Sequence, residues 1–369
     1  MPLDAHRITQ FPTHIELGAR VPQNLNSQIA VRPMANSDSA AWDQFVMAMP
    51  EATFFHRAGW CKIFDDVLRL KSHFMIAERN GKIAGVLPLV HQKSILFGNA
   101  LISAPFCVEG GTLAADDEAR SALDLAALSL METLRAPYIE FRSRNASRPG
   151  WKVKGDLYAT FSRPIVPDDH ANLLAIPRKQ RAVVRKTLES SLVSEVDNRV
   201  DRLYCVYAES VRNLGTPVFP KKYFAALSSV FGSDCDIIVV LDGGNPVSAV
   251  MNFYFKNTVL PYYGGGIASS RRTGANDFLY WEVMRRAAQR GCTTFDFGRS
   301  KAHTGAFAFK KNWGFEPHWL EYEYWLKPGT GLPDRNPTNP KYKLFIEMWK
   351  RLPLPLANAL GPLLIRGLG

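Results

Sequence analysis

The chain has 369 residues, of which 46% are hydrophobic and 21% are charged, so it has the composition of a folded globular protein and the length of two domains. Its 45 Lys and Arg against 34 Asp and Glu give a formal net charge of +11, which favours anionic partners such as phosphorylated carriers, RNA, coenzyme A or acidic lipid surfaces. The sequence holds no recognisable metal-ligand set, P-loop or G-x-S-x-G motif, so the usual signatures of metalloenzymes, kinases and serine hydrolases are missing.

The cysteines and the composition of the chain ends indicate the cellular compartment. The five cysteines form no C-x-x-C pair and are odd in number, which indicates reduced thiols. Because the first residues have no apolar signal core and no stretch reaches the roughly 18–20 apolar residues of a spanning helix, we expect a cytoplasmic protein. The segment 352–365 is uncharged and rich in Leu and Pro. It either caps the core, which we prefer, or contacts the inner face of the membrane as a peripheral element.

The first half begins with an irregular arm, residues 1–29, and then shows an ordered series of elements. Asn80-Gly81 is typical of a tight turn between two strands, and two acids, Asp116 and Asp117, are typical of a helix start. The predicted elements are a strand at 29–32, a helix at 39–49, strands at 73–78 and 83–90, a helix at 116–134 and a strand at 138–141 that leads into Arg142 and Arg144.

The second half repeats this order after a Pro-rich linker at 162–169. It has a Gly243-Gly244 turn where the first half has Asn80-Gly81. The predicted elements are helices at 203–214 and 220–231, strands at 236–241 and 247–255, a helix at 276–289 and a strand at 294–297. The matched spacing indicates an internal duplication, with an arm at 1–29, domains at 30–165 and 166–330, and a tail with a capping helix at 331–369.

The segment 293–315, TTFDFGRSKAHTGAFAFKKNWGF, contains most of the residues that are suited to catalysis. A short apolar strand runs into Gly298, Arg299, Lys301 and His303, and an aromatic run then surrounds Lys310 and Lys311. An ammonium held against aromatic rings and partly removed from water stabilises a developing negative charge strongly. The alternative is a surface hairpin whose lysines extend past aromatic neighbours. If the run is a strand, Lys311 points away from Lys310, toward solvent or phosphate.

Motifs in this segment and elsewhere resemble those of FemAB-like transferases, tandem GNAT-fold proteins that pass an aminoacyl or acyl group to an amine. The likeness covers roughly residues 30 to 355, and part of it is similar to a FemAB-related branch associated with exosortase (PEP-CTERM) and exopolysaccharide loci. The motifs that carry it are FHRAGW at 55–60, PF-x-x-x-GG at 105–111, IPRKQR at 176–181, FDFGRS at 295–300, F-K-x-x-W-G-F at 309–315, NPKYKLF at 339–345 and W-K-R-L-P-L-P at 349–355.

The resemblance implies an α/β fold with mixed sheets, built as two tandem GNAT-like domains with a ligand cleft between them. It implies transfer from aminoacyl-tRNA or acyl-CoA to an amine of a peptidoglycan-type, cell-envelope or exopolysaccharide precursor, without a tightly bound cofactor or metal and without DNA. Lys310 matches the family's lysine in F-K-x-x-W-G and is the expected catalytic residue. Arg299 and His303, which lie beside it in the sequence, complete the catalytic candidates, with His303 as a possible base.

Three further groups are candidates for binding. The segment 178–186 carries five cations and no acid, and helical spacing puts three of them on one face, which suits phosphates but is also typical of solvated surface. Arg271, Arg272, Gly274 and Asn276 resemble the pyrophosphate loop of coenzyme A enzymes, although Asn276 replaces a small residue and is also suited to cap the helix. The remaining candidates for substrate contact are Arg178, Lys179, Arg181, Arg185, Tyr262, Tyr263 and Lys311. A non-catalytic RNA- or anionic-carrier-binding protein remains the alternative, because the same residues would serve it.

Overall fold

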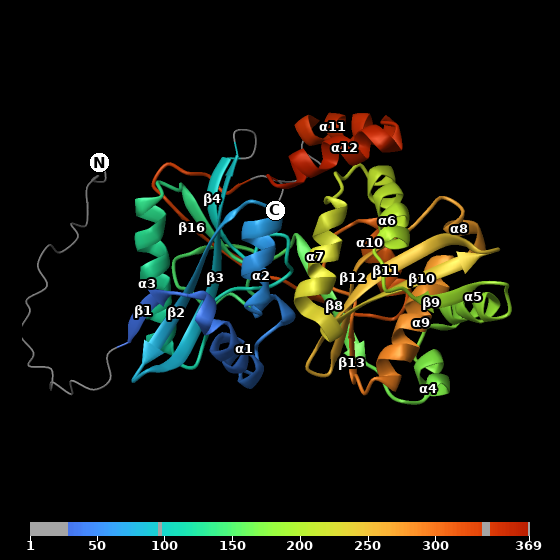
Figure 1. Cartoon of the computed structure of the whole chain (residues 1–369), viewed down its shortest axis with the longest axis horizontal. Helices are drawn as coiled ribbons and strands as arrows, with labels where there is room; N and C mark the ends of the chain where they lie inside the picture. Colours follow the sequence, from blue (N-terminus) through green and yellow to red (C-terminus); the bar gives the residue numbers. More distant parts are fainter. Residues whose placement is uncertain (1–28, 95–97, 334–339, 368–369) are drawn as a thin grey trace, which may run out of the picture.

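The computed structural model describes residues 29–94, 98–333 and 340–367, and it contains two mixed β-sheets that lie side by side with helices on their faces (Figure 1). All of the predicted arm except Ile29 lies outside the described residues. Within the described ranges, no helix combines the length and the apolar character needed to cross a membrane.

The first sheet has the strand order β1-β2-β3-β4-β6-β16-β7, with β5 paired to β3. Helix α3 packs on one face of it, and α1 and α2 lie on the other. The strands are β1 (Ala30–Pro33), β2 (Lys71–Arg79), β3 (Lys82–Ser94), β4 (Gly98–Ser103), β5 (Leu113–Ala114), β6 (Tyr138–Phe141), β7 (Lys152–Lys154) and β16 (Tyr322–Leu326). The helices are α1 (Ser39–Ala48), α2 (Gly59–Lys62) and α3 (Asp117–Thr133), with short turns η1 (Asn36–Asp38), η2 (Phe54–His56) and η3 (Ile63–Val67).

The second sheet has the order β14-β8-β13-β12-β11-β10-β9, with β15 paired to β8. Its strands are β8 (Tyr158–Pro164), β9 (Val193–Val196), β10 (Cys235–Asp242), β11 (Asn245–Phe255), β12 (Thr258–Gly266), β13 (Thr294–Asp296), β14 (Ser300–Lys301) and β15 (Pro317–Trp319). Its helices are α4 (Asp169–Leu174), α5 (Arg178–Leu188), α6 (Asp201–Asn213), α7 (Lys221–Phe231), α8 (Ser270–Thr273), α9 (Ala275–Gln289) and α10 (Gly305–Asn312), with a turn η4 (Gly232–Asp234), and the chain closes with α11 (Pro340–Arg351) and α12 (Leu354–Ile365).

The two sheets repeat one plan. In each, a hairpin (β2–β3 or β10–β11) is followed by a strand that pairs in parallel with the strand after a long helix, β4 with β6 and β12 with β13. The turn residues explain the hairpins, because Asn80, Gly81, Gly243 and Gly244 all adopt the positive φ that a tight turn needs. Asp116 caps α3 by accepting a hydrogen bond from the amide of Ala119 at 2.9 Å.

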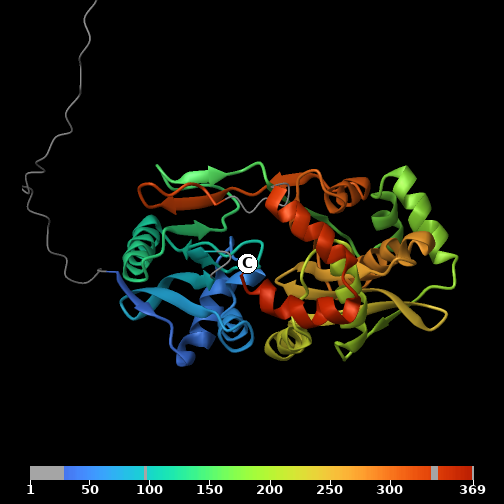
Figure 2. The same ribbon diagram turned by 90° about the horizontal axis from the view of Figure 1, so that it is seen from above.

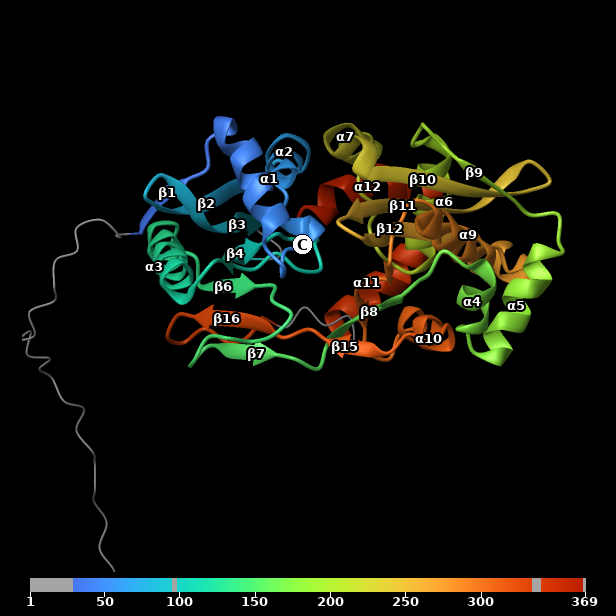
Figure 3. The same ribbon diagram turned by 90° about the horizontal axis from the view of Figure 1, so that it is seen from below.

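Strand pairing crosses the predicted domain limits. Strand β8 precedes residue 165 but pairs with β13 in the second sheet. Strand β16 lies within the predicted second domain but pairs with β6 in the first sheet (Figure 3). Each sheet is thus completed by a strand from beyond its own half. The limits at 165 and 330 stay a prediction, and this exchange ties the two halves together.

An aromatic core joins the halves. Phe54 of the first half stacks on Phe253 of the second at 4.4 Å between ring centroids, and Trp60 packs on Phe231 at 5.4 Å. Gly59 allows this approach, because a Cβ at its position would lie 2.7 Å from a methyl carbon of Val230. The α1/α2 side of the first sheet and the α6/α7 side of the second therefore share one core.

The chain's last helix packs on this body, in agreement with the preferred interpretation of the tail as a cap. Helix α12 contacts α6, and its residue Ile365 lies in the shared core. The Arg366 carbonyl accepts a hydrogen bond from Gln92 of β3 at 2.9 Å, which links the end of α12 to the first sheet.

The interpretation of the aromatic run after Gly305 as a strand or surface hairpin was wrong. Residues 305–312 form α10, in which Thr304 is the N-cap and its hydroxyl accepts from the amide of Phe307 at 3.3 Å. Phe309 and Trp313 stand one helical turn apart and pack on each other, which satisfies the aromatic pattern as a helix face. Lys310 is buried and Lys311 is exposed, so the two lysines still point in different directions.

We expect Phe54→Ala to destabilise both halves together, because its ring lies in the core they share. On the scale of buried Phe truncations, the free energy of unfolding should fall by about 3–5 kcal/mol. Urea denaturation measures the loss of stability, and hydrogen exchange of the β3 and β11 amides reports it separately for each half. Leu125→Ala, at a position 68% exposed on α3, is the control. Loss of protection in β3 alone would show that the halves are independent.

Candidate active site

The candidate site lies where β12 and β13 separate. These parallel strands pair only at Thr258 with Thr294 and Val259 with Phe295, after which β13 turns at Gly298 while β12 continues to Gly266. Strand ends that diverge in this way expose backbone and side chains to a common space, and function often lies there. Here the space is met by a loop of the first half.

Lys310 is the central side chain of the site. It is 8% exposed, and its ammonium donates to the carbonyl oxygens of Phe297 at 2.7 Å, Gly298 at 2.9 Å and Arg299 at 3.2 Å. It also lies 5.3 Å from the ring centroid of Phe161. Burial lowers the pKa of Lys310 to about 7; Asp296 opposes this shift and Arg299 adds to it. The three acceptors also favour the charged form, so the ammonium is held in place and lies close to its titration point.

One carboxyl, Asp296, lies near this lysine, and a second, Glu109, lies near Asp296. Asp296 accepts from the amide of Gly298 at 2.7 Å and from the Thr160 hydroxyl at 3.1 Å, and burial raises its pKa against the opposing effects of Arg144 and Lys310. Glu109 is 8% exposed and accepts from Arg144 at 2.8 Å. Burial raises the pKa of Glu109, and the nearby Asp296 raises it further. A raised pKa makes each carboxylate a stronger base than an ordinary Asp or Glu.

Arg299 is held on the other side of the turn. Its guanidinium donates to the Tyr322 hydroxyl at 2.9 Å and lies 4.5 Å from the ring centroid of Tyr158. Burial opposes its charge, but the hydroxyls of Tyr322, Tyr158 and Tyr262 more than offset this and its pKa lies above the ordinary value. Since Tyr322 belongs to β16 and Tyr158 to β8, the two exchanged strands position Arg299.

The loop at 104–111 forms the first half's wall of the site. Ala104 and Phe106 adopt positive φ, and Gly110 leaves no room for a side chain, because its Cβ would lie 2.4 Å from that of Ala104. The Phe106 carbonyl accepts from the Tyr262 hydroxyl at 2.8 Å, a direct bond between the halves. Such strained backbone is typical of functional loops, and here the contact across the halves fixes it.

Tyr262 and Tyr263 have different roles in the structure. A bulge in the pairing of β11 with β12 leaves Tyr262 without an opposite residue, which turns its side chain toward the loop at 104–111. Tyr263 is 6% exposed and shares a 2.7 Å hydrogen bond with the hydroxyl of Tyr223 in the shared core. The structure thus brings Tyr262, and not Tyr263, to the site.

The proposed pyrophosphate loop has a different environment from the one the sequence suggests. Gly274, with φ 71°, ends α8 and is the N-cap of α9, so the prediction that Asn276 caps this helix was wrong. The Asn276 amide instead accepts from the hydroxyl of Ser248 at 2.6 Å. A Cβ on Gly274 would lie 2.7 Å from the Thr187 methyl of α5. Helix α5 therefore occupies space over this turn, and Arg271 and Arg272 are exposed beside it.

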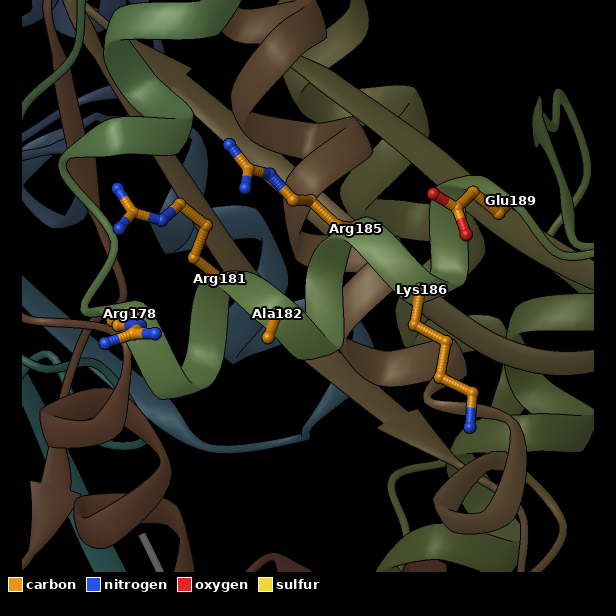
Figure 4. Close-up of a pocket in the computed structure, with 6 residues that line it drawn as sticks. All are labelled: Arg178, Arg181, Ala182, Arg185, Lys186 and Glu189. Atoms are coloured by element: carbon orange, nitrogen blue, oxygen red, sulfur yellow. The ribbon is translucent and has the colours of Figure 1, made fainter.

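The basic helix is confirmed as α5, and its cations line an open pocket of about 380 Å³ with Glu189 and Ala182 (Figure 4). Arg178, Lys179, Arg185 and Lys186 are exposed, while Arg181 donates to the Leu174 carbonyl at 3.1 Å. The start of α5 touches the end of α10, because a Cβ on Gly314 would lie 2.8 Å from Pro177. A ligand on the basic face would thus lie on the element that adjoins the Lys310 helix.

Of the three predicted catalytic residues, the structure brings Lys310 and Arg299 together around one turn. His303 is exposed in a left-handed turn before α10, and its role as a base stays a prediction. Sequence reasoning missed Glu109, Asp296, Arg144 and Tyr322 as members of the site. Two of them could have been noticed, because Asp296 lies within FDFGRS and Glu109 within PF-x-x-x-GG. A single acid in a short motif, however, does not show which residues it contacts in the fold.

Comparison with known proteins identifies the fold. Residues 175–311 match the family model of the acetyltransferase (GNAT) domain, and no curated protein sequence gives a significant match. The solved structure of FemX aligns with a TM-score of 0.65 at 16% identity, over 86% of this chain and 100% of its own. A tandem GNAT protein from the clavulanic acid biosynthesis pathway aligns with a TM-score of 0.54 at 14% identity, over 82% of this chain and 100% of its own.

A third neighbour is the C-terminal domain of a putative lysylphosphatidylglycerol synthetase from Agrobacterium fabrum, with a TM-score of 0.52 at 13% identity, over 78% of this chain and 91% of its own. At these identities the likeness shows the fold. The chain has the mixed α/β architecture of tandem GNAT-like domains, and this prediction is confirmed.

The loop that walls the site makes stability depend on pH through His56. Nδ1 of His56 accepts from the Thr53 amide at 3.0 Å, so Nε2 carries the proton and donates to the Gly111 carbonyl at 3.2 Å. Burial lowers the pKa of His56 to about 4. Below its unfolded pKa of about 6.5, only the unfolded chain takes up a proton at this residue, so the His56 contribution to the free energy of unfolding should decrease by about 3 kcal/mol between pH 6.5 and pH 4.

Urea denaturation of the wild type and of His56→Gln across this pH range isolates the effect, because glutamine keeps one donor and one acceptor but does not titrate. We expect a flatter pH dependence in the variant. Parallel curves for the two proteins would show that His56 is protonated in the folded state as easily as in the unfolded one.

Proposed function

We propose that the chain is an acyl- or aminoacyltransferase of the FemAB-like kind, which moves the acyl group of an activated ester or thioester to an amine. The observation that carries the proposal is the buried Lys310 ammonium near Asp296, at the diverging strands of a GNAT-like domain, with Glu109 near Asp296 and the pKa of both carboxyls raised. The likeness to FemX and to a domain of lysylphosphatidylglycerol synthetase supports an aminoacyl donor and a cell-envelope acceptor.

The ammonium of Lys310 has one replaceable bond. Its contacts to Phe297 and Gly298 are short and buried, whereas the contact to the Arg299 carbonyl is the longest, at 3.2 Å, and partly exposed. A carbonyl oxygen of the donor takes this third position. When the amine attacks, negative charge gathers on that oxygen, and the fixed ammonium stabilises the transition state more than the neutral donor.

The carboxyl pair completes the reaction. The amine nitrogen bonds to the donor's carbonyl carbon, the bond from that carbon to the ester oxygen or thioester sulfur breaks, and the leaving group keeps the electron pair. The proton lost by the attacking nitrogen passes to Asp296 or Glu109, whose raised pKa makes them better bases than ordinary carboxylates. Arg144 stabilises the carboxylate form that must be present before the attack.

The donor's anionic part binds on α5. Its cations Arg178, Arg181, Arg185 and Lys186 line one pocket. Arg178, Arg185 and Lys186 are exposed, which leaves them accessible to phosphates. Helix α5 also fills space over Gly274, where a coenzyme A pyrophosphate would lie against the backbone. The cations suit either donor, but the occupied space over Gly274 favours aminoacyl-tRNA over acyl-CoA. The acceptor is an amine of an envelope precursor of the peptidoglycan or exopolysaccharide type.

We expect Lys310→Met to lower kcat by about 100- to 1000-fold, the scale of losing one oxyanion-hole donor, with donor binding largely kept. Single-turnover transfer from a mixed aminoacyl-tRNA pool to a small amine measures the rate. Lys152→Met is the control, because Lys152 is an exposed lysine of β7 outside the candidate site. A folded Lys310→Met protein with the wild-type rate would show that this lysine only stabilises the 297–299 turn.

We expect charge reversal on α5 to weaken RNA binding in a salt-dependent way. Arg178→Glu with Arg181→Glu should reduce the slope of log affinity against log salt for unacylated tRNA by roughly one to two, because fewer counterions are released. Lys152→Glu, at an exposed lysine of β7, is the control for net charge. Unchanged affinity and slope would show that α5 does not bind RNA and is ordinary solvated surface. Intact tRNA binding without turnover would favour the alternative, a non-catalytic RNA-binding protein.

A further inference from the structure

The last two helices form an apolar outer surface. Helices α11 and α12 lie over α6 at one end of the molecule, and the view onto that end shows nothing covering them among the described residues (Figures 1 and 2). We call their exposed apolar residues the C-terminal face. Its members and exposed fractions are Leu344 (67%), Met348 (63%), Leu356 (52%), Leu360 (44%) and Leu363 (68%).

The helices that carry this face are fixed by their opposite sides. On α12, Ala357, Gly361 and Ile365 are buried, and a Cβ on Gly361 would lie 2.9 Å from the backbone nitrogen of Val218. On α11, Trp349 is 3% exposed, and the Lys350 carbonyl accepts from Arg212 of α6 at 3.2 Å. A loosely attached tail would not make these contacts. The apolar side is therefore presented to the outside by an ordered pair of helices.

The charges of the segment that carries the face have one predominant sign. From residue 343 to residue 367 the chain carries four basic residues and one acid, Glu347, which is paired with Lys350 at 2.8 Å. Helix α12 has no charged residue, while Lys343 and Arg351 are exposed on or next to α11. An apolar helix beside cations is complementary to a bilayer with anionic headgroups, where leucines enter the acyl boundary and cations meet phosphates.

We propose that the C-terminal face docks on the surface of an anionic lipid bilayer. Helix α12 has 12 residues, or about 18 Å at 1.5 Å per residue, which is shorter than the hydrocarbon core of about 30 Å, so it lies in the plane of the interface. If the proposed function holds, docking brings the transferase to acceptors that are carried on lipids. The docking itself does not depend on that function.

Vesicle sedimentation of the full chain tests the proposal. We expect binding to phosphatidylcholine vesicles that contain phosphatidylglycerol, and weaker binding to phosphatidylcholine alone. Leu356→Ser with Leu363→Ser should lower the partition coefficient by roughly tenfold or more, because two apolar side chains no longer leave water. Leu125→Ser is the matched control, since Leu125 is 68% exposed on α3 of the first half, and it should bind like the wild type.

Three outcomes would overturn the proposal. The first is no sedimentation with anionic vesicles; the second is equal binding by Leu356→Ser/Leu363→Ser and the wild type. The third is a concentration-dependent dimer that these substitutions abolish while vesicle binding stays absent, which would assign the face to a second copy of the chain. Circular dichroism of each variant confirms that the fold is kept, and Lys343→Glu with Arg351→Glu, which leaves the leucines in place, should reduce the preference for anionic vesicles.

Discussion

The architecture around the site depends on one buried charge. An ammonium that leaves water needs acceptors, and Lys310 finds three in consecutive carbonyls of the turn that ends β13. The lysine also stabilises the turn, because its one ammonium donates to all three carbonyls. Asp296 supports both, since its carboxyl accepts from the Gly298 amide within that turn. The proposed function uses this arrangement, because a charge that is already fixed in place needs little reorganisation during a reaction.

Holding such a site requires both halves of the chain. Arg299 stacks on Tyr158 of β8 and donates to Tyr322 of β16, the two strands that exchange between the sheets. The loop carrying Glu109 comes from the first half and Asp296 from the second. The shared aromatic core around Phe54 then fixes the relative position of the halves. The tandem arrangement is therefore part of the site, because neither half contains the lysine, the carboxyl pair and the aromatic support together.

Much of the fold was predictable because its signals are local. Asn80-Gly81 and Gly243-Gly244 mark hairpins by their need for positive φ, and Asp116 marks a helix start by its capping chemistry. The exchange of β8 and β16 was not predictable, since a strand's sequence shows that it pairs but not with which sheet. Residues 305–312 were misjudged because their aromatic spacing fits either a strand or a helix, and the N-cap at Thr304 decides between them.

The residues of the site also divide into those that the sequence predicts and those that only the structure reveals. Lys310 and Arg299 stand close together in the sequence, so the segment that contains them was recognisable. Glu109 is 201 positions away from Lys310 in the sequence, and its burial against Arg144 exists only after folding. The charge of α5 was visible as a run of cations, but its contact with the end of α10 required the structure.

The most direct test of the account is the pH dependence of the single-turnover transfer rate in the wild type and in Lys310→Met. In the proposed mechanism the ammonium form acts, and burial lowers its pKa to about 7, so the wild-type rate should fall as the pH rises through 7. The variant should be slower at low pH and should lack that descending limb, so that the two profiles converge above it. An identical descending limb in both proteins would contradict the assignment of the reacting charge to Lys310.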